Sequence, residues 1–466
     1  MSEEHVYDFA VIGGGSAGYA AARTAAGLGL RTAVIDGAEE LGGLCILRGC
    51  MPSKTLIQSA NAALRVRRAG EFGIRATLTA ADTAAIRDRK RTLIADFAGY
   101  RQEQLASGKF TLVRGTATFA DAHTLRVSLR EGGSVTLSAR SFLIATGSVI
   151  TWPEVPGLRE ANPWTSDTAL DAAEVPDSFI VLGGGAIALE MAHYLEGIGR
   201  RVTVIQRGPH LLRGMDSDIG DVVRKSFEHR GMVVHTGTSL RRVEVAGGMK
   251  SVVFEMDGRE HCVTAAEILL ALGRSAAADG LHPEVAEVRL KSGNISVSPT
   301  MQTSAPHIFA AGDVCGEAEV VHIAIQQGEM AARNAAALLR GTGELEQMDY
   351  RLRLFGVFTE PQAAAVGMNE AAAAASGRPW RAASYPFADH GKSMVMGETE
   401  GFVKMIADTE TGEILGASVV GPEATELIHQ PAAAMRFRST VRQFLDIPLY
   451  HPTLSEIWSY PAEELL

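Results

Sequence analysis

Cysteines and long apolar runs are scarce in this chain of 466 residues, and its 44 Lys and Arg are outnumbered by 54 Asp and Glu. Its 4 cysteines, Cys45, Cys50, Cys262 and Cys315, are too few to staple a chain of this size, and no Cys-x-x-Cys spacing occurs, so we expect no metal site. A formal net charge of −10 argues against nucleic acid and against an anionic membrane surface as partners. The sequence opens with no basic and apolar leader and holds no apolar run long enough to cross a bilayer. We therefore expect a cytoplasmic protein of about three domains.

A dinucleotide-binding pattern lies near the start of the chain. Val11–Gly18 reads Val-Ile-Gly-Gly-Gly-Ser-Ala-Gly, after an apolar stretch and before an Ala-rich stretch that predicts a helix. In such a loop the first glycine permits a tight turn, the second lets the backbone approach a pyrophosphate, and the third lets helix and strand pack closely. An acid that ends the next strand can accept both ribose hydroxyls of an adenosine. These features predict a dinucleotide site formed by Gly13, Gly15, Ser16, Gly18 and Asp36.

The same pattern occurs a second time, in the middle of the chain. A strand-like stretch leads into a glycine-rich loop that contains Gly183, Gly185 and Ala188. A chain that holds two redox dinucleotides normally passes electrons between them.

The second unit differs from the first in how its next strand ends. Gln206 and Arg207 replace the acid, and Arg213 follows six residues further on. Loss of the acid and gain of cations suit a 2′-phosphate, which favours NADPH over NADH. Two solvated surface arginines would give the same sequence.

The segment Gly42–Lys54 follows the first nucleotide unit and carries Cys45 and Cys50, separated by four residues. A cysteine pair beside a nucleotide site indicates thiol redox chemistry driven by the bound nucleotide. Pro52 suits the first turn of a helix, so Cys50 should lie at a helix N-terminus, where N–H groups without partners stabilise a thiolate.

With these motifs in this order, the chain resembles the FAD-dependent pyridine nucleotide-disulfide oxidoreductases over nearly its whole length. Further segments share the resemblance: Ala145–Ser148, Leu270–Arg274, Ala310–Val314 and His451–Glu456. The family implies an α/β fold with two Rossmann-like dinucleotide-binding domains and a C-terminal α+β dimerisation domain. It also implies FAD and NAD(P)H as cofactors. The further cofactor-binding residues implied are Gly43, Lys54, Ala145, Thr146, Gly147, Gly273 and Asp313.

The resemblance also implies catalytic roles. Electrons pass between the nicotinamide, the flavin and a Cys45–Cys50 disulfide, with Cys50 next to the flavin and Cys45 exchanging with substrate. Lys54 lies near the flavin and pairs with Glu190. His451, oriented by Glu456, acts as acid and base on the disulfide of the other subunit, so the active site is shared across a homodimer.

The domain order follows from the positions of the motifs. We expect an FAD-binding domain over residues 1–150, an NAD(P)-binding domain over 151–273, a return to the FAD domain over 274–345 and an interface domain over 346–466. Within these, residues 322–339 predict a helix ended by Gly341, and residues 401–420 predict a β-hairpin that turns at Thr411-Gly412.

The substrate is the most open question. Ala424–His429 and the segment after His451 resemble dihydrolipoamide dehydrogenases, whereas Arg23, Arg207 and Arg213 resemble glutathione reductases. We expect a dihydrolipoamide dehydrogenase-like enzyme for a small-molecule or protein-bound dithiol or disulfide. One alternative is an NADPH-dependent reductase of a glutathione-type disulfide or of a metal ion. Another is a flavoprotein electron carrier or nucleotide-sensing module without disulfide turnover.

Overall fold

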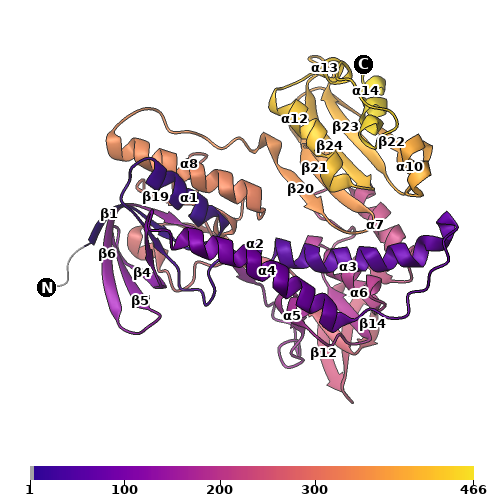
Figure 1. Ribbon diagram of the computed structural model, residues 1–466, viewed down its shortest axis with the longest axis horizontal. Coiled ribbons are helices and arrows are strands. Elements are labelled where there is room, and N and C mark those ends of the chain that lie inside the picture. The colour runs from indigo at the N-terminus through magenta and orange to yellow at the C-terminus, as the bar shows by residue number, and fades with distance from the viewer. Residues whose placement is uncertain (1–4) are drawn as a thin grey trace. The chain divides into compact units, whose positions relative to one another are not determined.

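The computed structural model describes residues 5–466, and it describes the side chains of residues 7–466 (Figure 1). The chain divides into two compact units, each made of segments that are distant in sequence. Unit 1 contains the residues up to Pro52, Arg89–Thr151 and Arg274–Asp349. Unit 2 contains Ser53–Asp88, Trp152–Gly273 and Tyr350–Leu466. The chain therefore leaves each unit and returns to it.

A seven-stranded sheet forms the centre of unit 1, in the order β3-β2-β1-β6-β5-β4, with β19 paired to β6 outside this path. Its strands are β1 (His5–Ile12), β2 (Thr32–Ile35), β3 (Thr111–Val113), β4 (Gly115–Asp121), β5 (Thr124–Leu129), β6 (Ser134–Ile144) and β19 (Ile308–Ala310). The pairs of β1 with β2 and with β6 are parallel, whereas β4, β5 and β6 pair antiparallel. Every residue of Phe9–Ile12 and Thr32–Ile35 is buried, as is typical of parallel strands covered on both faces.

Helices α1 (Ser16–Gly27) and α8 (Val321–Arg340) lie side by side in unit 1 (Figure 1). Small residues permit this contact, since a Cβ added at Gly328 would lie 2.3 Å from the carbonyl oxygen of Ala17. α8 ends at Gly341, whose φ of +65° is left-handed, so the predicted helix and its stop are both confirmed. The other elements of unit 1 are α2 (Gly43–Leu47), β7 (Ser148–Ile150), β16 (Arg274–Ala276), η2 (Pro283–Ala286), β17 (Leu290–Lys291), β18 (Asn294–Ile295) and η3 (Asp313–Cys315). Most of α4 (Thr83–Leu105), from Arg89 on, also belongs to unit 1.

Unit 2 repeats the βαβ pattern in a five-stranded sheet of order β11-β10-β9-β15-β8, in which every neighbouring pair is parallel. The elements are β8 (Trp164–Thr165), α5 (Ser166–Asp171), β9 (Ser178–Leu182), α6 (Ala186–Gly197), β10 (Arg201–Ile205), α7 (Ser217–His229), β11 (Val233–His235) and β15 (Glu267–Leu270). Most of α3 (Cys50–Arg68) and all of η1 (Ala69–Phe72) belong to this unit.

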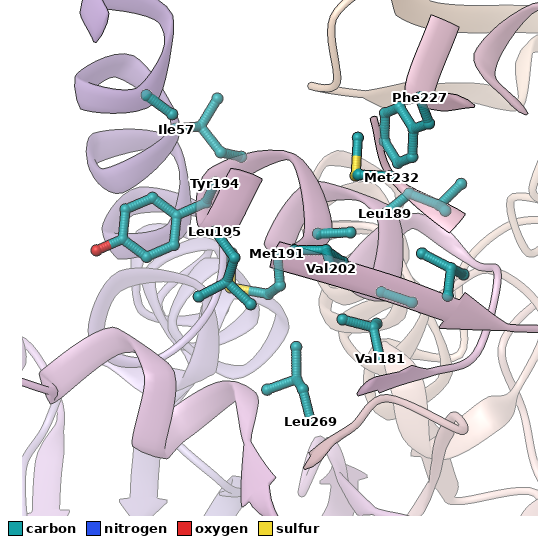
Figure 2. Close-up of a cluster of buried hydrophobic side chains, with 14 of the residues drawn as sticks. Ile57, Val181, Leu189, Met191, Tyr194, Leu195, Val202, Phe227, Met232 and Leu269 are labelled. Atoms are coloured by element: carbon teal, nitrogen blue, oxygen red, sulfur yellow. The ribbon is translucent and has the colours of Figure 1, made fainter. Parts of the chain in front are cut away.

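The core of this sheet is drawn in Figure 2. Val181 and Leu269 come from strands, Leu189 and Leu195 from α6, and Phe227 from α7, and each of them is 0% exposed. Ile57 brings α3 into the same cluster. An antiparallel sheet of three strands, β12 (Ser239–Ala246), β13 (Met249–Met256) and β14 (Arg259–Ala265), is also part of unit 2.

The C-terminal part of unit 2 is an antiparallel sheet of five strands, in the order β20-β21-β24-β23-β22. β23 (Phe402–Asp408) and β24 (Ile414–Gly421) pair antiparallel, which confirms the predicted hairpin. The remaining strands are β20 (Leu354–Val357), β21 (Gln362–Gly367) and β22 (Trp380–Pro386). The helices are η4 (Tyr350–Leu352), α9 (Glu370–Ala375), η5 (Phe387–Asp389), α10 (Gly391–Met396), α11 (Ala424–Leu427), α12 (His429–Arg436), α13 (Val441–Leu445), η6 (Ser455–Trp458) and α14 (Ser459–Glu464). The α/β class expected from the sequence is confirmed.

Candidate active site

The first glycine-rich loop joins β1 to α1 in unit 1. Gly13 has a left-handed φ of +102°, and a Cβ there would lie 2.4 Å from the carbonyl oxygen of Ala145. A Cβ at Gly18 would lie 1.8 Å from the carbonyl oxygen of Gly13. Gly15 immediately precedes α1, which begins at Ser16. The loop is therefore built so that its backbone and the helix N-terminus lie open to an anionic group.

Asp36 follows β2 and faces this loop. The amide of Gly14 donates to Oδ2 of Asp36 at 2.8 Å, and the amide of Ala38 donates to Oδ1 at 2.8 Å. The side chain is thus fixed by the backbone, and the remaining lone pairs of its carboxylate can accept the hydroxyls of a ribose.

Two further features of the loop region suit FAD. Gly43 has φ of +76°, and a Cβ there would lie 2.6 Å from Cα of Gly15, so only glycine fits where the segment before Cys45 crosses the loop. The hydroxyl of Thr146 is buried without a hydrogen-bond partner among residues 7–466. A bound ligand with polar atoms would satisfy that hydroxyl. The neighbouring Gly147 has φ of +76°.

Asp313 lies at the start of η3 and is held by two residues to which the sequence analysis gave no role. The hydroxyl of Ser148 donates to Oδ2 of Asp313 at 2.6 Å, and Nε of Arg274 donates to the Ser148 hydroxyl oxygen at 2.7 Å. Arg274 also donates to the Ser148 carbonyl at 2.7 Å. This chain fixes the carboxylate from two strands, β7 and β16.

Cys45 lies on α2, and Cys50 is the first residue of α3, as predicted from Pro52. Both side chains are half-buried. The turn between the two helices is tight, because a Cβ at Gly49 would lie 2.9 Å from the carbonyl oxygen of Leu44 and 3.2 Å from Cα of Cys45. The thiol at the start of α3 lies where helix N–H groups stabilise negative charge.

Lys54 and Glu190 form an ion pair between α3 and α6, both in unit 2. Nζ of Lys54 lies 2.9 and 2.8 Å from the two carboxylate oxygens of Glu190, which is 4% exposed. The backbone amide of Phe358 donates to Glu190 at 3.1 Å, and Nζ lies 4.7 Å from the centre of the Phe358 ring. A cation is therefore held in a partly buried place one turn after Cys50.

The second glycine-rich loop repeats the geometry of the first. Gly183 has φ of +122°, and a Cβ there would lie 2.3 Å from the carbonyl oxygen of Ala271. A Cβ at Gly184 would lie 2.9 Å from the side chain of Gln206, just as one at Gly14 would lie 2.7 Å from the Asp36 carboxylate. Gln206 thus occupies the place that the acid occupies in unit 1.

The other residues predicted to bind NAD(P) lie in or near the same loop or on the surface of unit 2. Gly185 precedes α6, Ala188 is fully buried in it, and Gly273 has φ of +116°. Arg207 and Arg213 are exposed, and neither guanidinium makes an ion pair with the part of the chain that the structure describes.

His451 and Glu456 lie together in unit 2. Nδ1 of His451 lies 3.2 and 3.0 Å from the two carboxylate oxygens of Glu456. The His451 side chain is 79% exposed and that of Glu456 is 13% exposed, so the imidazole faces outward from a largely buried carboxylate. A second histidine, His390, also approaches Glu456 and was missed at the sequence level, because nothing local in the sequence relates the two.

Among residues 5–466, no group of three or more His, Cys, Asp and Glu side chains is arranged to hold a metal ion. In the same range, no helix is both long and apolar enough to cross a membrane.

Comparison with known sequences decides the family. A sequence model described as pyridine nucleotide-disulphide oxidoreductase matches residues 7–328, and the dimerisation domain of the same family matches residues 355–461. The chain belongs to the pyridine nucleotide-disulphide oxidoreductase family. The fold of this family, with its two dinucleotide-binding domains and its C-terminal dimerisation domain, is therefore the fold of this chain.

Relatives in the family cover the chain almost completely. It is 34% identical over 451 residues to a dihydrolipoyl dehydrogenase of Bacillus subtilis, and this alignment covers 96% of each chain. It is 35% identical over 464 residues to a dihydrolipoyl dehydrogenase of Haloferax volcanii, with 98% of this chain and 95% of that one covered. A solved structure, the Cu(II) complex of the HOCl-induced flavoprotein disulfide reductase RclA from Escherichia coli, aligns with a TM-score of 0.86 at 27% identity, covering 99% of both chains.

The oxidoreductase family and these relatives define the type of enzyme. The chain is a dihydrolipoyl dehydrogenase-like, FAD-dependent disulfide oxidoreductase that uses a pyridine nucleotide. The geometry of unit 1 suits FAD. This unit contains the loop that begins at Gly13, the fixed Asp36 and the Thr146 hydroxyl that lacks a partner among the described residues.

Proposed function

We propose that Cys45 and Cys50 form the redox disulfide of this enzyme and exchange electrons with a small-molecule or protein-bound dithiol or disulfide of the lipoamide type. The main support for this proposal is the position of the two cysteines on consecutive helices, α2 and α3. Both helices come directly after a loop whose glycines leave room for a dinucleotide. An electron carrier would have no use for a second, substrate-facing thiol.

In the direction of dithiol oxidation, a substrate thiolate attacks the sulfur of Cys45, and Cys50 leaves as a thiolate at the start of α3. The second substrate thiol then attacks the mixed disulfide, closes the substrate disulfide and releases Cys45. His451 accepts the proton of each attacking thiol in turn and passes it to solvent.

FAD would be held by residues 1–150 and 274–345, with the loop Gly13–Gly18 on its pyrophosphate, Asp36 on its ribose and Asp313 and Thr146 on its remaining polar atoms. When bound, it carries two electrons between the nicotinamide nucleotide and the cysteine pair. Lys54, held by Glu190, keeps a positive charge near the reacting groups.

The proposed acid–base role of His451 requires a homodimer, in which His451 of one copy acts on the cysteine pair of the other. Residues 355–461 match the family's dimerisation domain, and His451 is exposed while its carboxylate partner is largely buried. An outward-facing imidazole suits a role in the active site of a second copy of the chain.

Residues 151–273 would bind the nicotinamide nucleotide, with a preference for NADPH. Gln206 stands where the ribose-binding acid of unit 1 stands, and Arg207 and Arg213 are exposed with no ion-pair partner in the described chain. A 2′-phosphate would supply the missing anion.

The cysteine assignment is tested by Cys45→Ser in the purified, flavin-loaded protein. Turnover with lipoamide should be lost. The oxidised protein should show a long-wavelength charge-transfer band from the Cys50 thiolate to the flavin, and anaerobic NADPH or NADH should still reduce the flavin and bleach that band. Cys262→Ser, on exposed β14, is the matched control and should behave as wild type. Retained lipoamide turnover in Cys45→Ser would refute the proposal.

The nucleotide preference is tested by comparing NADPH with NADH as reductants. We expect a lower KM for NADPH, which Arg207→Gln with Arg213→Gln should raise about tenfold or more, since charge-assisted bonds to phosphate are lost. Arg201→Gln, at the other end of β10, is the control. An equal or lower KM for NADH in the wild type would show that both arginines are simple surface charges.

A further inference from the structure

A second histidine faces the carboxylate that holds His451. His390 lies between η5 and α10 and is 0% exposed. Its Nε2 lies 3.5 Å from Oε1 of Glu456, the same oxygen that lies 3.2 Å from Nδ1 of His451. Glu456 therefore lies within reach of two imidazoles, one buried and one exposed.

The hydrogen bonds around His390 favour one tautomer. Its Nδ1 lies 2.8 Å from the hydroxyl oxygen of Ser393, and its buried Nε2 makes no hydrogen bond in the part of the chain that the structure describes, although Oε1 of Glu456 lies within ion-pair distance. If the Ser393 hydroxyl donates to Nδ1, then Nε2 carries the proton and can donate to Glu456. The opposite tautomer would place a lone pair against a carboxylate and leave a buried acceptor unpaired, which is unfavourable.

The charge state of His390 follows from its surroundings. Burial lowers the pKa of His390 below its usual 6.5, although Glu456 opposes this shift, and the nearby His451 adds to it. The ring of Tyr460 is the other titratable group that faces it, edge-on at 6.3 Å, and Tyr460 in turn stacks on Tyr385 at 4.0 Å. At neutral pH His390 is thus a neutral donor, and it leaves the negative charge of Glu456 available to His451.

We propose that His390, oriented by Ser393, is a positioning residue that holds Glu456 in the rotamer that orients His451. The inference rests on the proposed role of His451 as acid and base. Protonation of His390 in mild acid would draw Glu456 toward the buried imidazolium and away from His451. The acid limb of the pH profile of kcat would then report two protons.

Three variants test this with lipoamide and the reduced or oxidised nucleotide in the flavin-loaded protein. His390→Leu removes the donor, and we expect kcat at pH 8 to fall about ten- to a hundredfold with KM for the nucleotide unchanged. His390→Gln keeps an N–H near the Nε2 position without a titrating group. It should retain kcat within a few-fold and reduce the acid limb to one proton. Ser393→Ala, which frees the tautomer, should fall between these two.

The outcomes separate this inference from the proposed function. All three variants should keep the charge-transfer band when the nucleotide reduces them anaerobically, because His390 acts only through Glu456 and His451. His451→Gln should lower kcat in the same assay; if it does not, the proposed acid–base role itself is wrong. The positioning role is wrong if His390→Leu matches wild type in kcat and pH profile, or if a folded His390→Gln is as impaired as His390→Leu. If His390→Leu does not fold, His390→Gln and Ser393→Ala decide: wild-type pH profiles in both would overturn the inference.

Discussion

Nζ of Lys54 lies 2.9 Å and 2.8 Å from the two carboxylate oxygens of Glu190, and this pair ties α3 to α6. Glu190 is 4% exposed, and the backbone amide of Phe358 also donates to it, at 3.1 Å. A carboxylate removed from water to this degree depends on its cation, because the cost of burying the charge is offset only while the partner is present.

Lys54→Met should therefore destabilise unit 2. Loss of the cation leaves the buried carboxylate of Glu190 without an ion-pair partner, and we expect the free energy of unfolding to fall by about 3 kcal/mol. The double variant Lys54→Met with Glu190→Gln should recover part of that loss, since the buried charge is gone. Urea denaturation followed by tryptophan fluorescence measures both. Arg381→Met, which breaks an exposed pair with Glu464, should leave the midpoint nearly unchanged. Equal effects of Lys54→Met and Arg381→Met would contradict this account.

Gly18→Ala should abolish FAD retention. The added methyl would lie 1.8 Å from the carbonyl oxygen of Gly13, so the turn between β1 and α1 must open. Gly27→Ala, in the same helix with nothing within 4 Å of the new Cβ, is the matched control. It should keep the flavin and gain up to about 1 kcal/mol, because alanine favours a helix. The absorbance ratio of flavin to protein after purification measures both variants. A fully loaded Gly18→Ala protein would show that the loop tolerates the methyl.

The sequence predicted those parts of the molecule that depend on local patterns. Each of these parts has a turn residue or a spacing that only one local structure satisfies. They are the two glycine loops, the start of α3 at Cys50, the stop of α8 before Gly341 and the hairpin of β23 and β24. The pairs that join distant segments had weaker signals. Lys54 with Glu190 and His451 with Glu456 were expected only by resemblance to a family.

Other contacts were not predicted at all. Ser148 and Arg274 fix Asp313 from strands that pair only in the folded chain, and His390, which follows η5, approaches Glu456 of η6 across 66 residues of sequence. Such contacts depend on tertiary packing, and neither periodicity nor spacing encodes them. The roles of the site residues, the domain boundaries and the preference for NADPH stay predictions.

Unfolding should become easier in mild acid. Burial lowers the pKa of His193 well below its usual 6.5, and the cation of Arg230 lowers it further. The folded state therefore keeps His193 neutral while the unfolded chain takes up a proton below pH 6.5. The free energy of unfolding should then fall by up to about 1.4 kcal/mol for each pH unit below that value.

Urea midpoints between pH 5.5 and 8 measure this dependence. His193→Gln, which can still bond to Asn61, removes the titrating group and should flatten the slope by up to about 1.4 kcal/mol per pH unit. Stability that rises as the pH drops from 6.5 would contradict the sign of this argument.

Leu195→Ala should open a cavity in the cluster of Figure 2. Leu195 is 0% exposed on α6, and truncation of such a leucine costs about 2–5 kcal/mol. Ile187, on the same helix but 39% exposed, provides the control, and Ile187→Ala should cost much less. Differential scanning calorimetry of both variants compares them. A larger effect at position 187 than at position 195 would place the core of unit 2 elsewhere.

The carboxylate of Asp36 is clamped by two main-chain amides, those of Gly14 and Ala38, one on each oxygen. Folding alone fixes the side-chain torsions of Asp36. Binding of a ribose therefore costs no further side-chain conformational entropy at this residue. Apoprotein that stays folded after flavin stripping should for that reason recapture the cofactor in a single kinetic phase, limited by encounter and not by rearrangement of the pocket.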